Sequence, residues 1–258
     1  MSSLHSLVPI GAFGHNLIHF VFIVDFFMLI GKQALDMIRA YQPLRRSDDS
    51  LLRAAVAIIL RDSEQGTECL MMQRAKHEQD PWSGQMSFPG GKIDPGDGSA
   101  RAAAVREAYE EVGASLSEQD YIGQLDDLYG LRVNDVYSVH VACFVFKPQK
   151  ALELVANHEV ADMVWLPLSH LNNSGFAHDY VHPSQQSLSM PAVMIDEAKG
   201  QILWGLSLRM LINLYDLLGL PMQVLSERQR NELQATERRN LDPKSLDKIT
   251  QKIINRSQ

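Results

Sequence analysis

Residues 87–114, "SFPGGKIDPGDGSARAAAVREAYEEVGA", carry the most distinctive pattern of the sequence. This stretch joins a proline and two glycines to a polar loop, and the loop to an alanine-rich segment carrying Arg-Glu-x-x-Glu-Glu. Alanine has the highest helix propensity and glycine favours helix ends. The sequence therefore predicts a helix over residues 99–112, preceded by Gly98 and closed by Gly113.

Three glutamates follow a helical spacing in this segment. Glu107, Glu110 and Glu111 stand at positions i, i+3 and i+4, which lie on one face of a helix. Three carboxylates on one face repel each other, and a hard divalent cation such as Mg²⁺ or Mn²⁺ relieves that repulsion. The alternative is an acidic face turned to solvent, which the spacing alone does not exclude.

The neighbouring residues favour a binding site over a solvated face. Arg106 can pair with Asp97 in the loop or with Glu110 along the helix, and either pair would fix the helix against the loop. Gly90 and Gly91 allow the backbone to bend or to approach a ligand closely. Their carbonyls can ligate a metal and their amides can meet a phosphate, although a proline followed by glycines is also a common turn.

Together these residues resemble the Nudix box of the Nudix hydrolases. The family pattern is Gly, five residues, Glu, seven residues, then Arg-Glu-apolar-x-Glu-Glu-x-Gly-apolar. The second half of this pattern resembles "REAYEEVGA" (residues 106–114) at every position, with Ala108 and Ala114 as the apolar residues. The first half departs from the pattern. Five residues separate Gly91 from Asp97, which stands in place of Glu, and eight residues separate Asp97 from Arg106. A box with this longer loop resembles the branch that contains the coenzyme A pyrophosphatases.

The resemblance covers roughly residues 51–220, including "ILWGLSLRMLINLYDLL" near the end. It is weaker at the arginine-rich signature that the coenzyme A enzymes carry ahead of "FPGG". Arg74 is present, but Gln79 takes the place of the second arginine and one extra residue is inserted. The likeness to the Nudix hydrolases as a whole is therefore stronger than the likeness to the coenzyme A branch.

The resemblance implies a fold and an activity. The fold would be α+β, a Nudix-type α/β/α sandwich with a mixed central sheet. The activity would be hydrolysis, with Mg²⁺ or Mn²⁺, of a pyrophosphate bond in a nucleoside diphosphate-linked small molecule. The substrate could be coenzyme A-like, an ADP-sugar or a dinucleotide. Family relatives often form dimers, so a homodimer is a further expectation.

The resemblance also implies roles for the acidic residues. The three box glutamates, together with the carbonyl of Gly91 or Gly90, would hold the metal ions. The general base would be Glu110, Glu111 or a residue outside the box such as Glu159, and the sequence does not choose among them. Arg106 would be structural. The loop residue Asp97 could act as a base or support the metal ligands.

Two residues ahead of the box are candidates for substrate binding. Arg74 could meet a phosphate, and Gly90 could do so through its amide. Trp82 could stack on a base, or simply pack its loop. Trp165, Trp204 and His140 lie in apolar runs and are assigned to the core and to a strand, whereas His178 and His182 are placed in a loop between strands.

A second hypothesis belongs to another functional class. Some Nudix-like domains bind nucleotides without cleaving them and act as sensors or regulators. Such domains typically have an eroded acidic helix, and here all three carboxylates are present, which favours the enzyme.

The remaining elements follow from composition and periodicity. Strands are predicted over residues 51–60, 68–74, 121–130, 136–146 and from 159 on, a hairpin over 182–205, and an apolar helix over 206–220. The chain is thus divided into an N-terminal extension and linker (1–45), a Nudix domain (46–222) and a charged, helical tail (223–258).

The apolar stretch over residues 7–31 leaves three interpretations open. It is long enough to cross a bilayer, which would anchor the chain with its catalytic domain in the cytoplasm. Asp25 and two histidines interrupt its apolar run, and an aspartate inside a lipid bilayer is energetically costly. A helix packed on the domain or on a partner is therefore a second interpretation. A true start at Met28 or Met37 is the third. Without an anchor, the expected location is the cytoplasm.

Charge and cysteine content restrict the remaining functions. The net charge of −7 argues against general nucleic-acid binding, because phosphate-backbone binders present a basic face. Cys69 and Cys143 both lie in apolar runs and are predicted to be buried free thiols.

Overall fold

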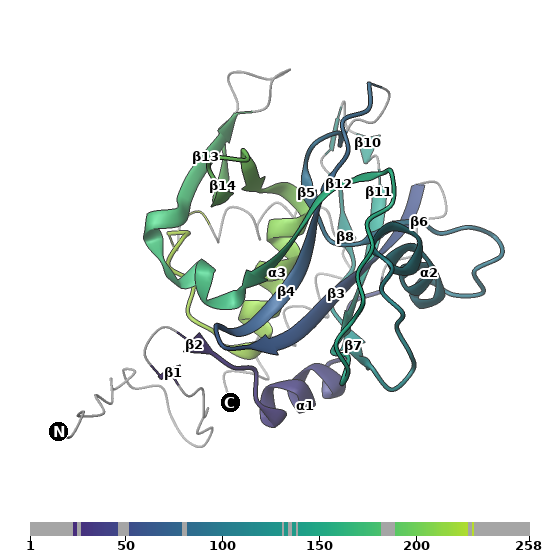
Figure 1. Ribbon diagram of the computed structural model, residues 1–258, viewed down its shortest axis with the longest axis horizontal. Coiled ribbons are helices and arrows are strands. Elements are labelled where there is room, and N and C mark those ends of the chain that lie inside the picture. The colour runs from purple at the N-terminus through teal and green to yellow at the C-terminus, as the bar shows by residue number, and fades with distance from the viewer. Residues whose placement is uncertain are drawn as a thin grey trace.

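The helices and strands form three layers around a mixed sheet (Figure 1). The computed structural model describes residues 23–24, 27–45, 52–78, 82–130, 132–133, 136–137, 139–181, 189–226 and 229. Most of the apolar stretch over residues 7–31, His182 and nearly all of the charged tail lie outside these ranges. Within them, the structure contains no helix of the length and apolarity that a membrane crossing requires.

The long strands carry the sheet, and shorter ones complete it. The strands are β1 (Ile23–Val24), β2 (Phe27–Met28), β3 (Leu52–Ser63), β4 (Gly66–Arg74), β5 (Met86–Ser87), β6 (Gly90–Lys92), β7 (Tyr121–Gln124), β8 (Leu128–Tyr129), β9 (Arg132–Val133), β10 (Val136–Tyr137), β11 (Val139–Phe146), β12 (Val160–Pro167), β13 (Ala177–Val181), β14 (Ser189–Asp196) and β15 (Gln201–Leu203). The helices are α1 (Lys32–Ala40), α2 (Ala100–Val112), α3 (Gly205–Leu218) and the 3₁₀ helices η1 (Leu168–Asn172) and η2 (Ser174–Phe176).

The centre of the sheet is the place where β3 and β4 diverge. They pair as an antiparallel hairpin near their turn, at residues 60–63 and 66–69. Farther along, β3 pairs with β6 and β4 pairs with β5. The "FPGG" segment therefore fills the gap between the two strands, and β11 runs parallel to β3 on its other edge.

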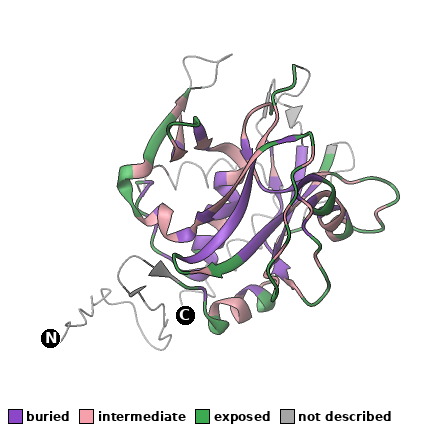
Figure 2. Ribbon diagram, viewed as in Figure 1, coloured by how far each residue is buried: buried purple, intermediate pink, exposed green. Residues whose placement is uncertain are grey.

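The two faces of the sheet bury different cores. Along β3, Ile58 and Leu60 join one apolar cluster while Ala57 and Ile59 join the other, as alternation along a strand requires. Helix α2 covers the second cluster, and α1 and α3 pack on the first. Figure 2 shows the buried strands enclosed between these helices. The predicted α+β class and α/β/α sandwich are confirmed.

Helix α1 packs against the domain rather than trailing from it. Ile38 is fully buried, and its carbonyl lies so near Gly123 of β7 that a Cβ there would approach within 2.5 Å. The amide of Ile30 donates to Thr67 Oγ1 at 2.8 Å. The phenol of Tyr41 donates to Asp126 at 2.8 Å. The packed region thus begins before residue 46, where the sequence placed the start of the domain.

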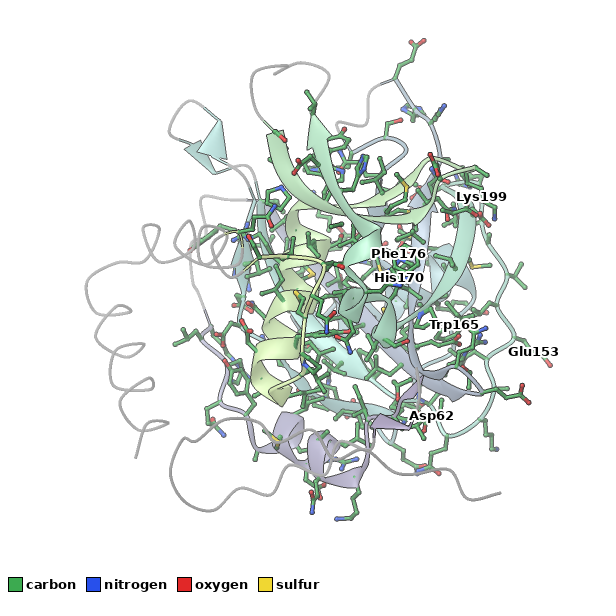
Figure 3. The ribbon with its side chains drawn as sticks, turned by 90° about the vertical axis from the view of Figure 1, so that its left-hand side faces the viewer. Asp62, Glu153, Trp165, His170, Phe176 and Lys199 are labelled. Carbon is green, nitrogen blue, oxygen red and sulfur yellow. The ribbon has the colours of Figure 1, made fainter. Side chains whose placement is uncertain are left out.

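Strands β13, β14 and β15 form a separate antiparallel sheet beside α3. The sequence predicted the β14–β15 pair as a hairpin but placed His178 in a loop, which is wrong because His178 lies in β13. The stacked rings of His170 and Phe176, 3.6 Å apart, join η1 to η2 (Figure 3).

The two cysteines behave as predicted. Cys69 and Cys143 are both buried and unbonded. Burial raises the pKa of the Cys69 thiol to about 12, so it stays protonated and inert at neutral pH.

Candidate functional site

The acidic helix α2 is fixed at both ends by its own sequence. The hydroxyl of Ser99 accepts a hydrogen bond from the amide of Ala102 at 3.1 Å and caps the first turn. Gly113 ends the helix in the left-handed conformation, at a φ of 69°. Ala104 and Ala108 are fully buried, and such small side chains let the helix lie close to the sheet. The helix therefore carries its glutamates down to the "FPGG" backbone.

The two glycines of "FPGG" are required by close contacts on both sides. A Cβ on Gly90 would lie 2.4 Å from the carbonyl oxygen of Ala55, and one on Gly91 would lie 2.6 Å from the Glu107 carboxyl carbon. The Gly90 amide donates to Glu111 Oε2 at 2.8 Å. The carboxylates of Glu107 and Glu111 thus rest directly on this backbone.

Arg106 forms hydrogen bonds with the loop, with helix α2 and with strand β6. Its Nε and Nη2 donate to the two carboxylate oxygens of Asp97 at 2.7 and 2.9 Å. Its Nη1 donates to Glu107 at 3.0 Å and to Glu110 at 2.9 Å, and Nη2 also reaches the carbonyl of Lys92 at 3.1 Å. Both pairings that the sequence offered for Arg106 are therefore present together.

Asp97 accepts the hydrogen bonds of Arg106 from a position in the loop before α2. The Arg106 guanidinium holds the pKa of Asp97 below its ordinary value, so the carboxylate is ionised at neutral pH. Its Oδ2 also accepts a hydrogen bond from the backbone amide of Asp94 at 2.7 Å. The geometry makes Asp97 an anchor for Arg106, which explains how an aspartate replaces the glutamate of the family pattern.

A second arginine approaches the cluster from the sheet. Arg74 is the last residue of β4, and its Nη1 lies 3.8 Å from Glu111 Oε1. The Arg74 side chain is 25% exposed, whereas that of Glu111 is 3% exposed. The buried carboxylate therefore faces a guanidinium on a side chain that is partly exposed to solvent.

The segment before β12 delivers one more carboxylate to the site. The amides of Val155 and Asn157 donate to the carbonyls of Val112 and Glu111, at 3.0 and 2.8 Å, and so satisfy the end of α2. The amide of Ala75 donates to the carbonyl of Glu159 at 2.7 Å. Glu159 is thereby held where its charge acts on Glu107 and Glu111. The sequence named Glu159 but gave no signal for the backbone bonds that place it.

Burial and mutual repulsion disfavour the ionised forms of Glu107 and Glu111, the two inner glutamates of the cluster. The pKa of Glu111 is raised to about 8, mainly by burial. The charges of Glu107 and Glu159 contribute to this rise, and the Gly90 amide and Arg74 oppose it. Burial is likewise the main cause that raises the pKa of Glu107. A cation placed between these carboxylates would relieve both effects.

The donor set fits a hard divalent cation. Carboxylate oxygens of Glu107, Glu110 and Glu111 and the carbonyl of Gly91 are the ligand types that Mg²⁺ and Mn²⁺ take. Among the described residues, no three acidic, histidine or cysteine side chains have already converged to metal-binding distance. Arg106 donates to the carboxylates of Glu107 and Glu110, and the Gly90 amide donates to that of Glu111, so metal binding would require these side chains to turn.

The tryptophans differ in exposure: Trp82 is exposed, whereas Trp165 and Trp204, which the sequence assigned to the core, are partly buried. Trp82 is 37% exposed, in the turn that leads to β5. Trp165 is partly buried against the α2-side core, with the Arg61 guanidinium 4.0 Å above its ring. Trp204 stacks on Tyr180 at 4.1 Å. Only Trp82 keeps the exposure that stacking on a ligand needs, among these three tryptophans.

His140 is a strand histidine, as the sequence predicted. Its Nε2 lies 3.1 Å from Asp127, whose other oxygen accepts Gln124 at 3.0 Å, and all three side chains are buried. The sequence did not single out Asp127 or Gln124, because neither belongs to a recognisable motif.

A family model supplies the decisive comparison. The model of the NUDIX domain matches residues 51–186, more than half of the chain. The chain belongs to the Nudix family. Members of this family generally use divalent metal ions and act on nucleoside diphosphate-linked compounds. The matched range contains the acidic helix, both glycines, both site arginines and Glu159.

Curated relatives carry the same family name. A probable nudix hydrolase of Schizosaccharomyces pombe is 30% identical over 57% of this chain and 47% of its own length. A mitochondrial coenzyme A diphosphatase of Homo sapiens is 37% identical over 37% of this chain and 41% of its own. The Nudix hydrolase NudL of Escherichia coli K12 is 42% identical over 34% of this chain and 46% of its own. The chain thus spans about half the length, or less, of these relatives.

Solved structures of Nudix proteins are similar at lower identity. A MutT/nudix family protein from Enterococcus faecalis is 16% identical with a TM-score of 0.47, and the likeness covers 80% of each chain. The NUDIX domain of Shewanella oneidensis NrtR, solved with ADP ribose, is 23% identical with a TM-score of 0.39 over 52% of this chain and 82% of that one.

Proposed function

We propose that this Nudix protein is a Mg²⁺- or Mn²⁺-dependent hydrolase that cleaves a pyrophosphate bond in a nucleoside diphosphate-linked small molecule. The observation that carries the proposal is the contact of two mutually repelling glutamates, the buried Glu111 and the partly buried Glu107, with the glycine backbone of "FPGG". A structural core gains nothing from burying these charges, whereas a site for a divalent cation requires them.

The metal ligands in this proposal are Glu107, Glu110 and Glu111, with the carbonyl of Gly91. When bound, the metal neutralises the diphosphate and lowers the pKa of a water molecule. Arg106 holds helix α2 against the loop through its two hydrogen bonds to Asp97.

The proton of the attacking water needs a carboxylate that is ionised and within reach. Glu159 has the more suitable position, since its side chain is 53% exposed and its charge acts on both inner glutamates. Glu111 is buried and donates its oxygens to the metal in this account, which leaves it less suited to accept the proton.

Substrate groups would be bound on the open side of the cluster. Arg74 faces a diphosphate there, and Trp82 offers an exposed ring for a base. A coenzyme A-like substrate is favoured over an ADP-sugar or a dinucleotide by the human relative named as a coenzyme A diphosphatase. A cytoplasmic location, with or without an N-terminal membrane anchor, stays a prediction.

The test is hydrolysis of a substrate panel with Mg²⁺ or Mn²⁺, read by product mass. The panel contains coenzyme A, ADP-ribose, NADH, diadenosine polyphosphates and nucleoside triphosphates. Glu111→Gln should lower kcat/KM by about 10²-fold or more, because it removes a metal ligand. Glu118→Gln is the matched control, since Glu118 pairs with Arg101 on the surface. Metal-independent cleavage, or equal loss in both variants, would overturn the proposal.

A further inference from the structure

A buried glutamine lies between two strands, outside the acidic cluster. Gln201 of β15 is 1% exposed, and its Nε2 donates to Asp162 Oδ2 of β12 at 2.9 Å. Its Oε1 has no hydrogen-bond partner among the residues that the structure describes. Burying an amide oxygen without a partner costs free energy, and an apolar side chain of similar size would avoid that cost. The amide at this position therefore points to a requirement other than core stability.

The same amide also reaches strand β4. Gln201 Nε2 lies 3.4 Å from Gln73 Oε1, and Gln73 Nε2 donates to the carbonyl of Gly84 at 3.3 Å. Both bonds are long, so each is weak on its own. Together with the bond to Asp162, they form a chain of side chains from β12 and β15 to residues 82–85, which we call the Trp82 turn.

Two β-bulges lie beside this chain of side chains. The register of β12 on β4 shifts just before Asp162, which then pairs with Gln73. The register of β14 on β15 shifts just before Asp196, which then pairs with Gln201. A bulge redirects the side chains that follow it, and bulges are over-represented next to active sites. The local backbone is therefore built in a way that serves these polar contacts.

The Trp82 turn lies beside the acidic cluster. The amide of Arg74 donates to the carbonyl of Gln85 at 3.0 Å, and the amide of Gln85 donates to the carbonyl of Trp82 at 3.1 Å. The amide of His77 donates to Ser83 Oγ at 2.8 Å. These bonds hold both ends of the turn, and the glutamine of β4 adds a bond to a carbonyl between them. The exposed indole is thus attached to the strand that carries Arg74.

We propose that Gln201 is a positioning residue for nucleobase recognition: through Gln73 it fixes the Trp82 turn so that the exposed indole stacks on the base of the substrate. The inference rests on the proposed function and deepens it, because it separates recognition of the base from the metal chemistry. Stacking depends on the plane and distance of the ring, so a turn that is already fixed loses less freedom when the base binds.

The chain of side chains contains none of the proposed metal ligands. Its loss should therefore weaken binding of a ligand that carries a base and leave binding of a bare diphosphate unchanged. A purely structural role of Gln201, which would only fasten β15 to β12, predicts no difference between the two ligands. This difference is therefore the quantity to measure, and it does not depend on turnover.

The experiment is calorimetric titration of the full chain with two ligands, with Mn²⁺ in excess. The first is α,β-methylene-ADP, and the second is methylenediphosphonate, which has the same uncleavable linkage but no base. Gln201→Met and Gln73→Met remove the amides and keep side chains of similar length. Lys199→Met is the control: Lys199, labelled in Figure 3, donates to Asp162 at 2.6 Å but lies outside the path from Gln201 to the turn.

Gln201→Met and Gln73→Met should each weaken binding of α,β-methylene-ADP about threefold to tenfold, which is part of what stacking on one base contributes. Binding of methylenediphosphonate should stay within about twofold of wild type in both, since metal and diphosphate contacts are untouched. Lys199→Met should match wild type with both ligands. In a Trp82→Ala background, adding Gln201→Met should change the affinity for the analogue by less than about twofold, because the ring that it positions is gone.

Three outcomes in folded variants would overturn the inference: unchanged affinity for the analogue, equal weakening of both ligands, or an effect of Gln201→Met that persists in Trp82→Ala. If Gln201→Met does not fold, Gln73→Met decides the matter, since Gln73 is only partly buried. Equal binding of the two ligands by the wild-type chain would remove base stacking, and this inference with it, while leaving the metal site in place. Failure of the wild type to bind methylenediphosphonate with Mn²⁺ would instead remove the proposed function itself.

Discussion

At the scale of single residues, Glu111 is the side chain at which burial, a backbone hydrogen bond and the neighbouring charges of the site all meet. Its carboxylate is buried, touches the Gly90 amide and faces Arg74, and its charge is opposed by Glu107 and Glu159. The glutamate spacing let the sequence predict that three carboxylates share one helix face. It did not distinguish the buried Glu111 from the exposed Glu110, because burial depends on how the helix lies on the sheet.

The raised pKa of Glu111 predicts a pH dependence of stability in the metal-free protein. Between the ordinary value of 4.5 and the folded value of about 8, the folded chain keeps a proton that the unfolded chain releases. The free energy of unfolding therefore falls as the pH rises through this window. Glu111→Gln should remove most of that slope, a difference on the order of a few kcal/mol between pH 5 and pH 8.

Urea unfolding with a chelator at pH 5, 6, 7 and 8 measures this effect. Glu118→Gln changes an exposed glutamate in the same way and should keep the wild-type slope. Equal slopes for wild type and Glu111→Gln would show that Glu111 ionises in the fold without cost.

At the scale of elements, the site is a close approach of helix α2 to strand β6. Periodicity and composition predicted α2, α3 and the long strands β3, β4 and β11, because each has a strong local pattern. Helix α1 and strand β13 were missed. Helix α1 is short, and its main support is tertiary contact with β7 and the buried side of α3. Local pattern carries no information on such contacts.

The approach of α2 to β6 predicts a sharp difference between Gly91 of β6 and Gly96 of the loop that follows it. Gly91→Ala places a methyl group 2.6 Å from the Glu107 carboxyl and forces that side chain away, whereas a Cβ on Gly96 meets nothing within 4 Å. Gly91→Ala should weaken Mn²⁺ binding about 10- to 100-fold, as for other changes that misplace a metal ligand. Gly96→Ala should bind as wild type.

Calorimetric titration with Mn²⁺ checks this prediction, with the melting temperature of each variant recorded beside it. Wild-type affinity in Gly91→Ala would mean that Glu107 is not a metal ligand in the arrangement described above.

At the scale of the whole molecule, the sheet brings together residues that are far apart in the chain. Arg74 ends β4, the glycines stand between the diverging strands, the glutamates come from α2, and Glu159 precedes β12 (Figure 1). The motif allowed the family, the fold class and most of these residues to be predicted. It did not contain the backbone bonds that hold Glu159 in place. The bond from Ala75 to Glu159 and the bond from Asn157 to Glu111 join residues that are 84 and 46 positions apart in the chain.

The most direct test of the metal site is a crystal of the full chain soaked in Mn²⁺, with anomalous scattering used to locate the ion. We expect a peak about 2.0–2.4 Å from carboxylate oxygens of Glu107 and Glu111 and close to the Gly91 carbonyl, and no such peak in Glu111→Gln. A peak elsewhere, in a protein that still hydrolyses its substrate with Mn²⁺, would contradict the central claim that these residues form the catalytic metal site.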